Sequence, residues 1–132
     1  MISEEYVLRV AAETTKNGGS ASKLNAKKFL PILDIWSFPK YPSRTAILPP
    51  TVHLTTELRQ FITENEVFLN EPDCWLGTWV NPRSGEYYLD IATGIAGENE
   101  ARETAMKISV EDGRKIVAIF NAKRNETIYL WE

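Results

Sequence analysis

Apolar residues recur every three or four positions in several stretches of the chain, a spacing that gathers them on one face of a helix. The helices expected from this spacing cover residues 3–16, 55–70 and 98–111, with a short fourth helix over residues 23–30. Ser3 and Thr55 carry side chains suited to cap the helices that they precede. Gly18 is expected to end the first helix and Pro31 the short one, because glycine favours a helix C-terminus and proline cannot continue a helix.

Alternation of apolar and polar residues predicts strands in the second half of the chain. These strands cover residues 74–80, 86–92, 115–121 and 126–131. The sequence Asn81-Pro82-Arg83-Ser84-Gly85 has the composition of a turn and joins the first pair into a hairpin, and residues 122–125 join the last pair. Residues 93–97 are expected to form a loop.

Residues 31–50 have a composition of their own. They hold five of the seven prolines, interleaved with Trp36, Phe38 and Tyr41. Proline fixes its own backbone and disfavours the helical conformation in the residue before it. We therefore expect an extended segment that wraps over the rest of the protein, with one strand at residues 45–48.

Between residues 45 and 121 the expected order is strand, helix, strand, strand, helix, strand, which is typical of the ferredoxin-like fold. The chain of 132 residues is long enough for one hydrophobic core. We therefore expect a single α+β domain over residues 1–132. Residues 51–132 would form a ferredoxin-like or related antiparallel sheet of 4–5 strands with two helices on one face, and residues 1–50 an N-terminal helix and a proline-rich wrap. Without the strand at residues 45–48, four strands would remain.

The alternation also sorts side chains onto two faces of the expected sheet. One face is aliphatic and suits packing under helices: Leu76, Val80, Leu89, Ile91, Val117, Ile119, Ile128 and Leu130. The other face is aromatic and carries two acidic residues: Trp75, Trp79, Tyr88, Phe120, Tyr129 and Trp131, with Glu86 and Asp90. At roughly 150 to 250 Å² per ring, this surface exceeds the few hundred Å² of apolar patch usual on a monomer. We therefore expect the aromatic face to be covered.

Three kinds of cover are open. The first 44 residues could lie across the face through Val7, Val10, Trp36, Phe38 and Tyr41. A second copy of the chain or another protein is the next alternative. Single-stranded nucleic acid stacked on the rings is the third, but Glu86 and Asp90 would repel phosphates, and the basic and aromatic signature of RNA-recognition motifs is missing from the sequence.

The net charge of −3 hides an uneven distribution. Residues 16–44 carry six basic side chains and one acidic, whereas residues 57–112 carry twelve acidic and four basic side chains. The two blocks are expected to attract each other, and a basic strip for phosphate backbones is the alternative. No apolar run approaches the roughly 18 residues of a membrane span, and the first residues do not resemble a signal peptide, so we expect a cytoplasmic protein without membrane contact.

Few residues are suited to catalysis. Cys74 and His53 are the only cysteine and histidine, so we expect no disulfide, no metal site and no cofactor. Cys74 is expected to be a small core residue, because the neighbouring Asp73 would raise its pKa. His53 with Lys40 and Arg44 could supply a base and a cation for RNA cleavage, so a small RNA-processing or toxin-like nuclease is the alternative function.

The favoured function is therefore binding without catalysis, through the aromatic face and the proline-rich segment. Gly77 lies between two tryptophans of one strand and would leave a shallow notch where a ligand or ring can approach. The predicted binding residues are Trp36, Tyr41, Arg44, Trp75, Gly77, Trp79, Tyr88 and Trp131. A protein partner or a homodimer is expected, and the sequence does not identify a small-molecule ligand.

The hairpin from Leu76 to Asp90, Leu-Gly-Thr-Trp-Val-Asn-Pro-Arg-Ser-Gly-Glu-Tyr-Tyr-Leu-Asp, is followed by a helix and then by Lys115-Ile-Val-Ala-Ile-Phe120. This combination resembles a segment of small bacterial and phage proteins of unassigned function. The resemblance implies a phage or mobile-element protein and carries no activity, cofactor or catalytic residue with it.

Overall fold

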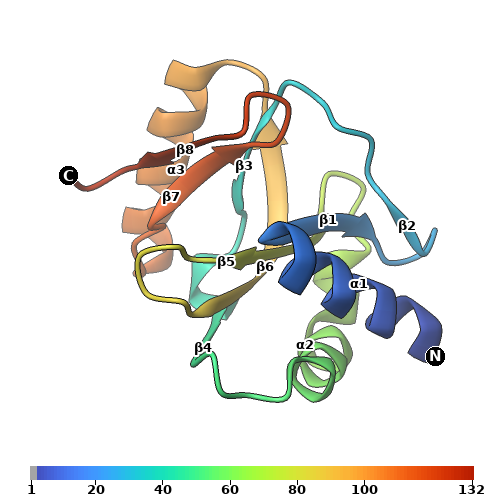
Figure 1. Ribbon diagram of the computed structural model, residues 1–132. Coiled ribbons are helices and arrows are strands. Elements are labelled where there is room, and N and C mark those ends of the chain that lie inside the picture. Colours follow the sequence, from blue (N-terminus) through green and yellow to red (C-terminus); the bar gives the residue numbers. More distant parts are fainter. Residues whose placement is uncertain (1–2) are drawn as a thin grey trace.

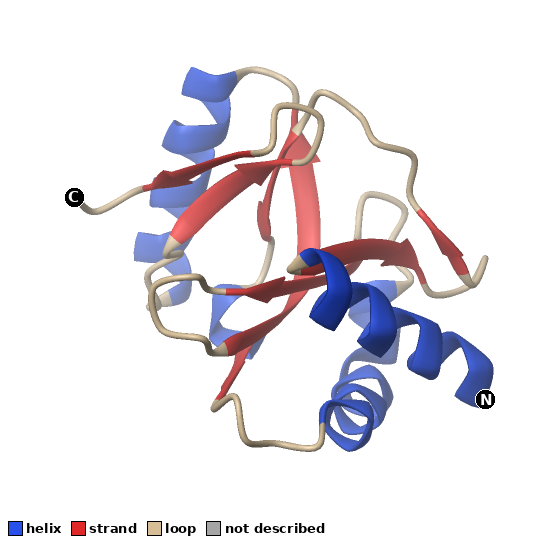
Figure 2. Cartoon of the chain, viewed as in Figure 1, coloured by secondary structure: helices blue, strands red, loops and turns tan. Residues whose placement is uncertain are grey.

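The computed structural model describes residues 3–132, in which three α-helices lie against one curled sheet (Figures 1 and 2). The helices are α1 (Glu4–Asn17), α2 (Leu54–Leu69) and α3 (Glu98–Asp112). The strands are β1 (Gly19–Lys23), β2 (Lys28–Phe29), β3 (Trp36–Pro39), β4 (Ala46–Leu48), β5 (Trp75–Val80), β6 (Tyr87–Ile95), β7 (Ala118–Asn121) and β8 (Glu126–Tyr129). A short 3₁₀ turn, η1 (Pro42–Arg44), separates β3 from β4.

The sheet is antiparallel throughout and has the order β2-β1-β5-β6-β3-β7-β8, with β4 also paired to β6. Its centre is the long strand β6. One edge of β6 pairs with β5, and the other edge pairs first with β3 and then with β4. The sheet curls around β6 into a half-barrel, so that the β1–β2 end and the β7–β8 end rise on either side of an open middle (Figure 1).

All three helices lie on the outer face of this half-barrel. The α1 and α2 helices bury Val7, Val10 and Leu58 against Leu76 and Leu89 of the sheet. The α3 helix packs on the other half of the same face in a second cluster, which consists of Trp36, Phe38, Ala101, Ala105, Ile116, Ile119 and Leu130. Among residues 3–132, none of the helices combines the length and the apolar character that a membrane crossing requires.

The helix predictions are confirmed for α1, α2 and α3. Ser3 caps α1 by accepting a hydrogen bond from the backbone N–H of Tyr6, and Gly18 ends the helix in the left-handed conformation. The predicted cap of α2 is wrong: His53 occupies the cap position, and Thr55 lies inside the first turn.

The α+β class is confirmed, but the ferredoxin-like sheet of 4–5 strands with two helices on one face is wrong, because the sheet has eight strands and three helices cover it. Half of these strands come from residues 3–50. The expected helix at residues 23–30 is instead the turn between β1 and β2, where Lys27 has a φ of 53° that a helix does not allow. Pairing of Ser22 with Phe29 and of Lys23 with Lys28 closes this segment into a hairpin.

The proline-rich segment is not a wrap around the sheet but part of it. It is extended as expected, and β4 matches the predicted strand. However, Trp36–Pro39 forms the unpredicted strand β3, which lies between β6 and β7. Pairing with β3 also extends β6 to Ile95, through residues 93–95 that were expected to form a loop.

Candidate functional site

The inner face of the half-barrel is aromatic, as the alternation predicted. In the β5–β6 pairing, Trp79 lies opposite Tyr88 and Gly77 opposite Asp90, whereas Leu76 and Ile91 share the helix-covered face. The register of β3, β7 and β8 places Ser37, Phe120 and Thr127 on the inner face too. The aliphatic and aromatic residues of these strands are therefore separated by the sheet.

The inner face encloses a cavity of about 620 Å³. Side chains from both ends of the sheet line it, among them Ala21 of β1 and Phe120 of β7, and Trp75, Trp79 and Asp90 lie between them. The volume is in the range of about 300 to 1,000 Å³ that is usual for small-molecule sites.

The residues of the first 44 that were expected to lie across the aromatic face are found elsewhere. Val7 and Val10 are buried on the opposite, helix-covered face, and Trp36 and Phe38 also belong to the core there. Another part of the first 44 residues, residues 29–35, borders the cavity instead. Within it, Phe29, Ile32 and Leu33 are 39%, 72% and 48% exposed, so apolar side chains surround the cavity and meet solvent.

Gly77 leaves room in the middle of the cavity. A Cβ at this position would lie 3.0 Å from the Cβ of Ala92 and 3.6 Å from the Cβ of Asp90. Any larger side chain would have to extend over Asp90, into the space that the cavity now occupies. The notch expected from the sequence therefore coincides with the position opposite Asp90.

Asp90 is the carboxyl group at the centre of the cavity lining. The hydroxyl of Thr45 donates a hydrogen bond to its Oδ1 at 2.8 Å. Burial raises the pKa of Asp90 to about 6, although the Thr45 hydrogen bond and the charge of Arg114 act to lower it. Arg114 does not pair with Asp90, since its guanidinium donates to the backbone carbonyls of Thr45 at 2.7 Å and Pro42 at 3.3 Å.

Asp90 and Glu13 are the charged side chains that line the cavity within residues 3–132, and no lysine, arginine or histidine lines it. Lys23 occupies an inner-face position of β1 but donates its Nζ to the backbone carbonyls of Glu71 and Cys74. The cavity is therefore apolar and aromatic, with negative charge only.

Only part of the predicted binding set lies in this cavity. Trp75, Gly77 and Trp79 line it. Tyr88 shares their face and contacts Trp79 edge-to-face, with ring centroids 5.1 Å apart, but it borders a separate small cavity beside Arg114. Trp131 is 39% exposed beyond β8, where its Nε1 donates a hydrogen bond to the carbonyl of Ile116.

The predicted site residues of the proline-rich segment have structural contacts. Trp36 is fully buried under α3. Tyr41 donates its hydroxyl to Glu71 at 2.7 Å, and the guanidinium of Arg44 lies 4.3 Å above the ring of Phe68. These two side chains connect the segment to α2 on the outside of the half-barrel.

The structure does not bring together the residues considered for a nuclease. His53 caps the start of α2, where its Nδ1 lies 2.7 Å from the hydroxyl of Thr56. Arg44 donates a hydrogen bond to Asn65, which lies twelve residues after His53 along α2. At a rise of about 1.5 Å per residue, His53 and Asn65 are about 18 Å apart along the helix. Lys40 is bound to carboxylates near the far end of α2.

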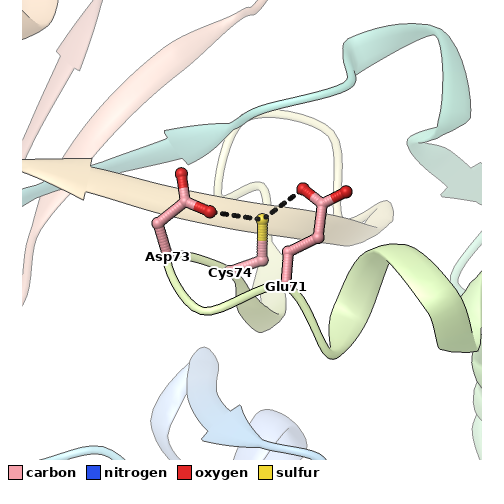
Figure 3. Close-up of side chains that lie close together, drawn as sticks. All are labelled: Glu71, Asp73 and Cys74. Atoms are coloured by element: carbon pink, nitrogen blue, oxygen red, sulfur yellow. Dashed lines mark hydrogen bonds between the residues drawn. The ribbon is translucent and has the colours of Figure 1, made fainter.

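Glu71, Asp73 and Cys74 gather at the turn between α2 and β5 (Figure 3). Their ligating atoms lie within 4.8 Å of one another, but the ammonium of Lys40 lies 3.0 Å from both Glu71 and Asp73 and neutralises them. Burial raises the pKa of the Cys74 thiol to about 12, which opposes formation of the thiolate that binds metals. This cluster therefore connects β3 to the α2–β5 turn through an ion pair.

We expect Lys40→Met to lower the free energy of unfolding by about 1 kcal/mol at pH 7, because it removes two half-exposed ion pairs. The hydrogen bonds to this cluster lower the pKa values of Glu71 and Asp73. Their stabilising effect is therefore present above their unfolded pKa values and is lost as the pH falls below about 4. Urea unfolding at pH 7 and pH 3 measures this difference.

Lys107→Met is the matched control for Lys40→Met. Lys107 forms a more exposed pair with Glu111 at 3.8 Å, so its replacement is expected to change stability by only a few tenths of a kcal/mol. Equal losses in the two variants, or a loss for Lys40→Met that persists at pH 3, would contradict the structural role assigned to Lys40.

Two features of the cavity escaped the sequence analysis. Asp90 was placed on the correct face but interpreted only as a charge that repels phosphate. Its position opposite a glycine in a predicted hairpin was the signal for a reachable carboxyl group. The apolar run at residues 29–35 was expected to belong partly to a helix and partly to the wrap, and no local signal places it beside the cavity.

Comparisons of this chain with protein-family models, with curated proteins and with solved structures gave no match.

Proposed function

We propose that this protein is a binding protein whose site is the cavity on the inner face of the half-barrel. The observation that carries the proposal is a concave, ring-lined space of about 620 Å³ with apolar side chains exposed beside it. A concave apolar space with few polar groups is the usual form of a site for a small ligand. The proposal therefore assigns the cavity to a small molecule rather than to a flat protein interface.

Within this proposal, each part of the lining has a role. Trp75, Trp79 and Phe120 provide apolar contact area, and Asp90 provides the polar group that orients the ligand. Exposed Ile32 and Leu33 lie where a ligand would enter and would lose contact with water when it binds. A homodimer, a protein partner and a cytoplasmic location stay predictions from the sequence.

We expect the neutral dye Nile red to bind the wild-type protein with a blue-shifted emission, and Ala21→Trp to abolish this binding. Ala21 lies directly opposite Gly77 in the β1–β5 pairing, so an indole at this position would occupy the space over the notch. Tryptophan is compatible with a strand, so the variant should keep its fold, which circular dichroism checks.

Val110→Trp is the matched control, because it adds the same indole to a position of α3 that is 76% exposed. It should bind Nile red as the wild type does. Absence of dye binding to the wild type, or equal binding to Ala21→Trp, would overturn the assignment of the cavity as the site.

A further inference from the structure

We propose that the cavity selects organic cations, that is, a protonated amine or quaternary ammonium group joined to an apolar body. This inference rests on the proposed function, since it names the class of ligand for the same cavity.

The charged groups of the lining have one sign. Asp90 and Glu13 are both acidic, and no basic side chain of residues 3–132 lines the cavity. Two cations of neighbouring segments already have partners. Lys23 is bound to backbone carbonyls, and Arg124 is paired with Asp34 at 2.9 Å. The two carboxylates would repel an anionic ligand and attract a cation.

One carboxylate oxygen of Asp90 is free to accept a hydrogen bond from a ligand. Its Oδ1 accepts the Thr45 hydroxyl, and its Oδ2 has no hydrogen-bond partner among residues 3–132. The nearest guanidinium that acts on it, Arg114, is held by the carbonyls of Thr45 and Pro42. A half-buried carboxylate without a cationic partner is costly, and an ammonium group on a ligand would remove that cost by forming a charge-assisted hydrogen bond.

The rings around Asp90 suit the same class of ligand. Trp75, Trp79 and Phe120 line one cavity with the carboxyl group. The faces of aromatic rings attract organic cations, and tryptophan does so most strongly. The apolar remainder of the ligand would contact Ala21, Ala92 and the exposed side chains of residues 29–35.

A metal ion fits this site poorly. The one group of three metal-ligating side chains within residues 3–132 is Glu71, Asp73 and Cys74, which does not line the cavity. Asp90 offers one carboxylate in a space much larger than an ion, so the apolar lining would remain unused. The cavity therefore favours a cation that carries apolar surface.

The test uses three probes with the same phenyl ring and nearly the same length: phenethylamine, phenethyl alcohol and hydrocinnamate. They carry a positive charge, no charge and a negative charge at pH 7.5. Titrations followed by ¹H–¹⁵N NMR measure each Kd and show which backbone amides shift. We expect shifts at Gly77, Asp90 and the indoles of Trp75 and Trp79, with phenethylamine about tenfold tighter than the alcohol and hydrocinnamate weakest.

Asp90→Asn tests the origin of this preference. Asparagine keeps the size of the side chain and can still accept the Thr45 hydrogen bond, so the fold is expected to persist, and the NMR spectrum checks it. The advantage of phenethylamine over the alcohol should disappear. Glu103→Gln is the matched control, since it removes the same charge from an exposed position of α3 and should leave the preference unchanged.

Acidification supplies a second readout on the wild type. The groups that act on Asp90 are the Thr45 hydroxyl and Arg114, and Glu13 is the other carboxylate of the lining. Because the pKa of Asp90 is about 6, phenethylamine should bind about tenfold more weakly at pH 5 than at pH 7.5, with no such change for the alcohol.

The outcomes separate the two proposals. Equal affinity for the amine and the alcohol, with shifts at the cavity, would overturn the cation preference and leave the binding site standing. Tighter binding of hydrocinnamate, or a preference for the amine that survives in Asp90→Asn, would also overturn it. If none of the three probes shifts the cavity residues, the proposed function itself fails.

Discussion

Replacing Trp36 with alanine should lower the free energy of unfolding by about 3 to 5 kcal/mol, which is the usual cost of truncating a buried tryptophan. Trp36 is fully buried between β3 and α3, against Ala101 and Ile119. Because small domains are stable by only about 5 to 15 kcal/mol, this loss is a large part of the total. Urea unfolding followed by circular dichroism measures it.

Trp131→Ala is the matched control, because Trp131 is 39% exposed and makes one hydrogen bond, to Ile116. Its loss should be about 1 kcal/mol or less. Trp36→Phe should cost less than the alanine variant, since it keeps one ring and removes an indole N–H that has no partner within residues 3–132. Equal effects of Trp36→Ala and Trp131→Ala would contradict the burial of Trp36 under α3.

Trp36 illustrates where the sequence misleads. Prolines surround it, and a proline-rich segment with aromatic residues is typical of an exposed, extended binding surface. In the structure, the same extended backbone pairs with β6 and β7, and Pro39 ends the strand, where a missing N–H is tolerated. Local composition correctly predicted an extended backbone for this segment. It could not show that β6 and β7, which are distant in the sequence, would pair with the two edges of β3.

The β1–β2 hairpin was missed for a related reason. The sequence of β1, Gly-Ser-Ala-Ser-Lys, contains none of the β-branched or aromatic residues that favour strands. The strand forms because β5 pairs with it and because Ser22 and Thr78 exchange hydrogen bonds with Tyr6 and Thr14 of α1. These contacts link residues far apart in the chain, so no local pattern predicts them.

The separation of aromatic and aliphatic faces could be predicted, because it depends only on the two-residue period of a strand. The cavity could not, because it depends on the curl of the sheet and on the position of residues 29–35. The two-residue period placed Trp75, Gly77 and Trp79 on one face of the sheet, and all three line the cavity. Trp36, Tyr41 and Arg44 were chosen on composition, and they lie elsewhere.

The half-barrel also explains why one face can remain uncovered by helices. All three helices occupy the outer face, where they bury the aliphatic side chains. The curl of the sheet brings rings of separate strands together, since the ring centroids of Trp79 in β5 and Tyr129, the last residue of β8, lie 6.4 Å apart. An aromatic surface that would be too large on a flat sheet is thus tolerated as the lining of a cavity.

Replacing Asp90 with asparagine should raise the free energy of unfolding by about 1 to 3 kcal/mol at pH 7 in the absence of ligand, because the variant folds without a partly desolvated charge. Burial raises the pKa of Asp90 from its ordinary value of 3.8 to about 6. The folded protein therefore binds a proton more tightly than the unfolded chain does. Charging Asp90 disfavours the folded state, and asparagine avoids this cost.

The difference in stability between the wild type and Asp90→Asn should depend on pH. Well below pH 3.8 Asp90 is protonated in both states, so the wild type and Asp90→Asn should be similarly stable there. As the pH rises through the window from 3.8 to about 6, the wild type loses stability relative to the variant, and above this window the difference is constant. Urea unfolding of both proteins between pH 4 and pH 7.5 measures the difference.

Asp73→Asn should behave in the opposite way, since the hydrogen bond from Lys40 lowers the pKa of Asp73 and its charge stabilises the fold. A constant difference between the wild type and Asp90→Asn across this pH range would mean that Asp90 has an ordinary pKa and costs nothing when charged. If the expected difference is found, the chain keeps at the centre of its cavity a carboxylate that weakens the fold. Such a cost is typical of groups retained for binding, and an ammonium ligand would offset it.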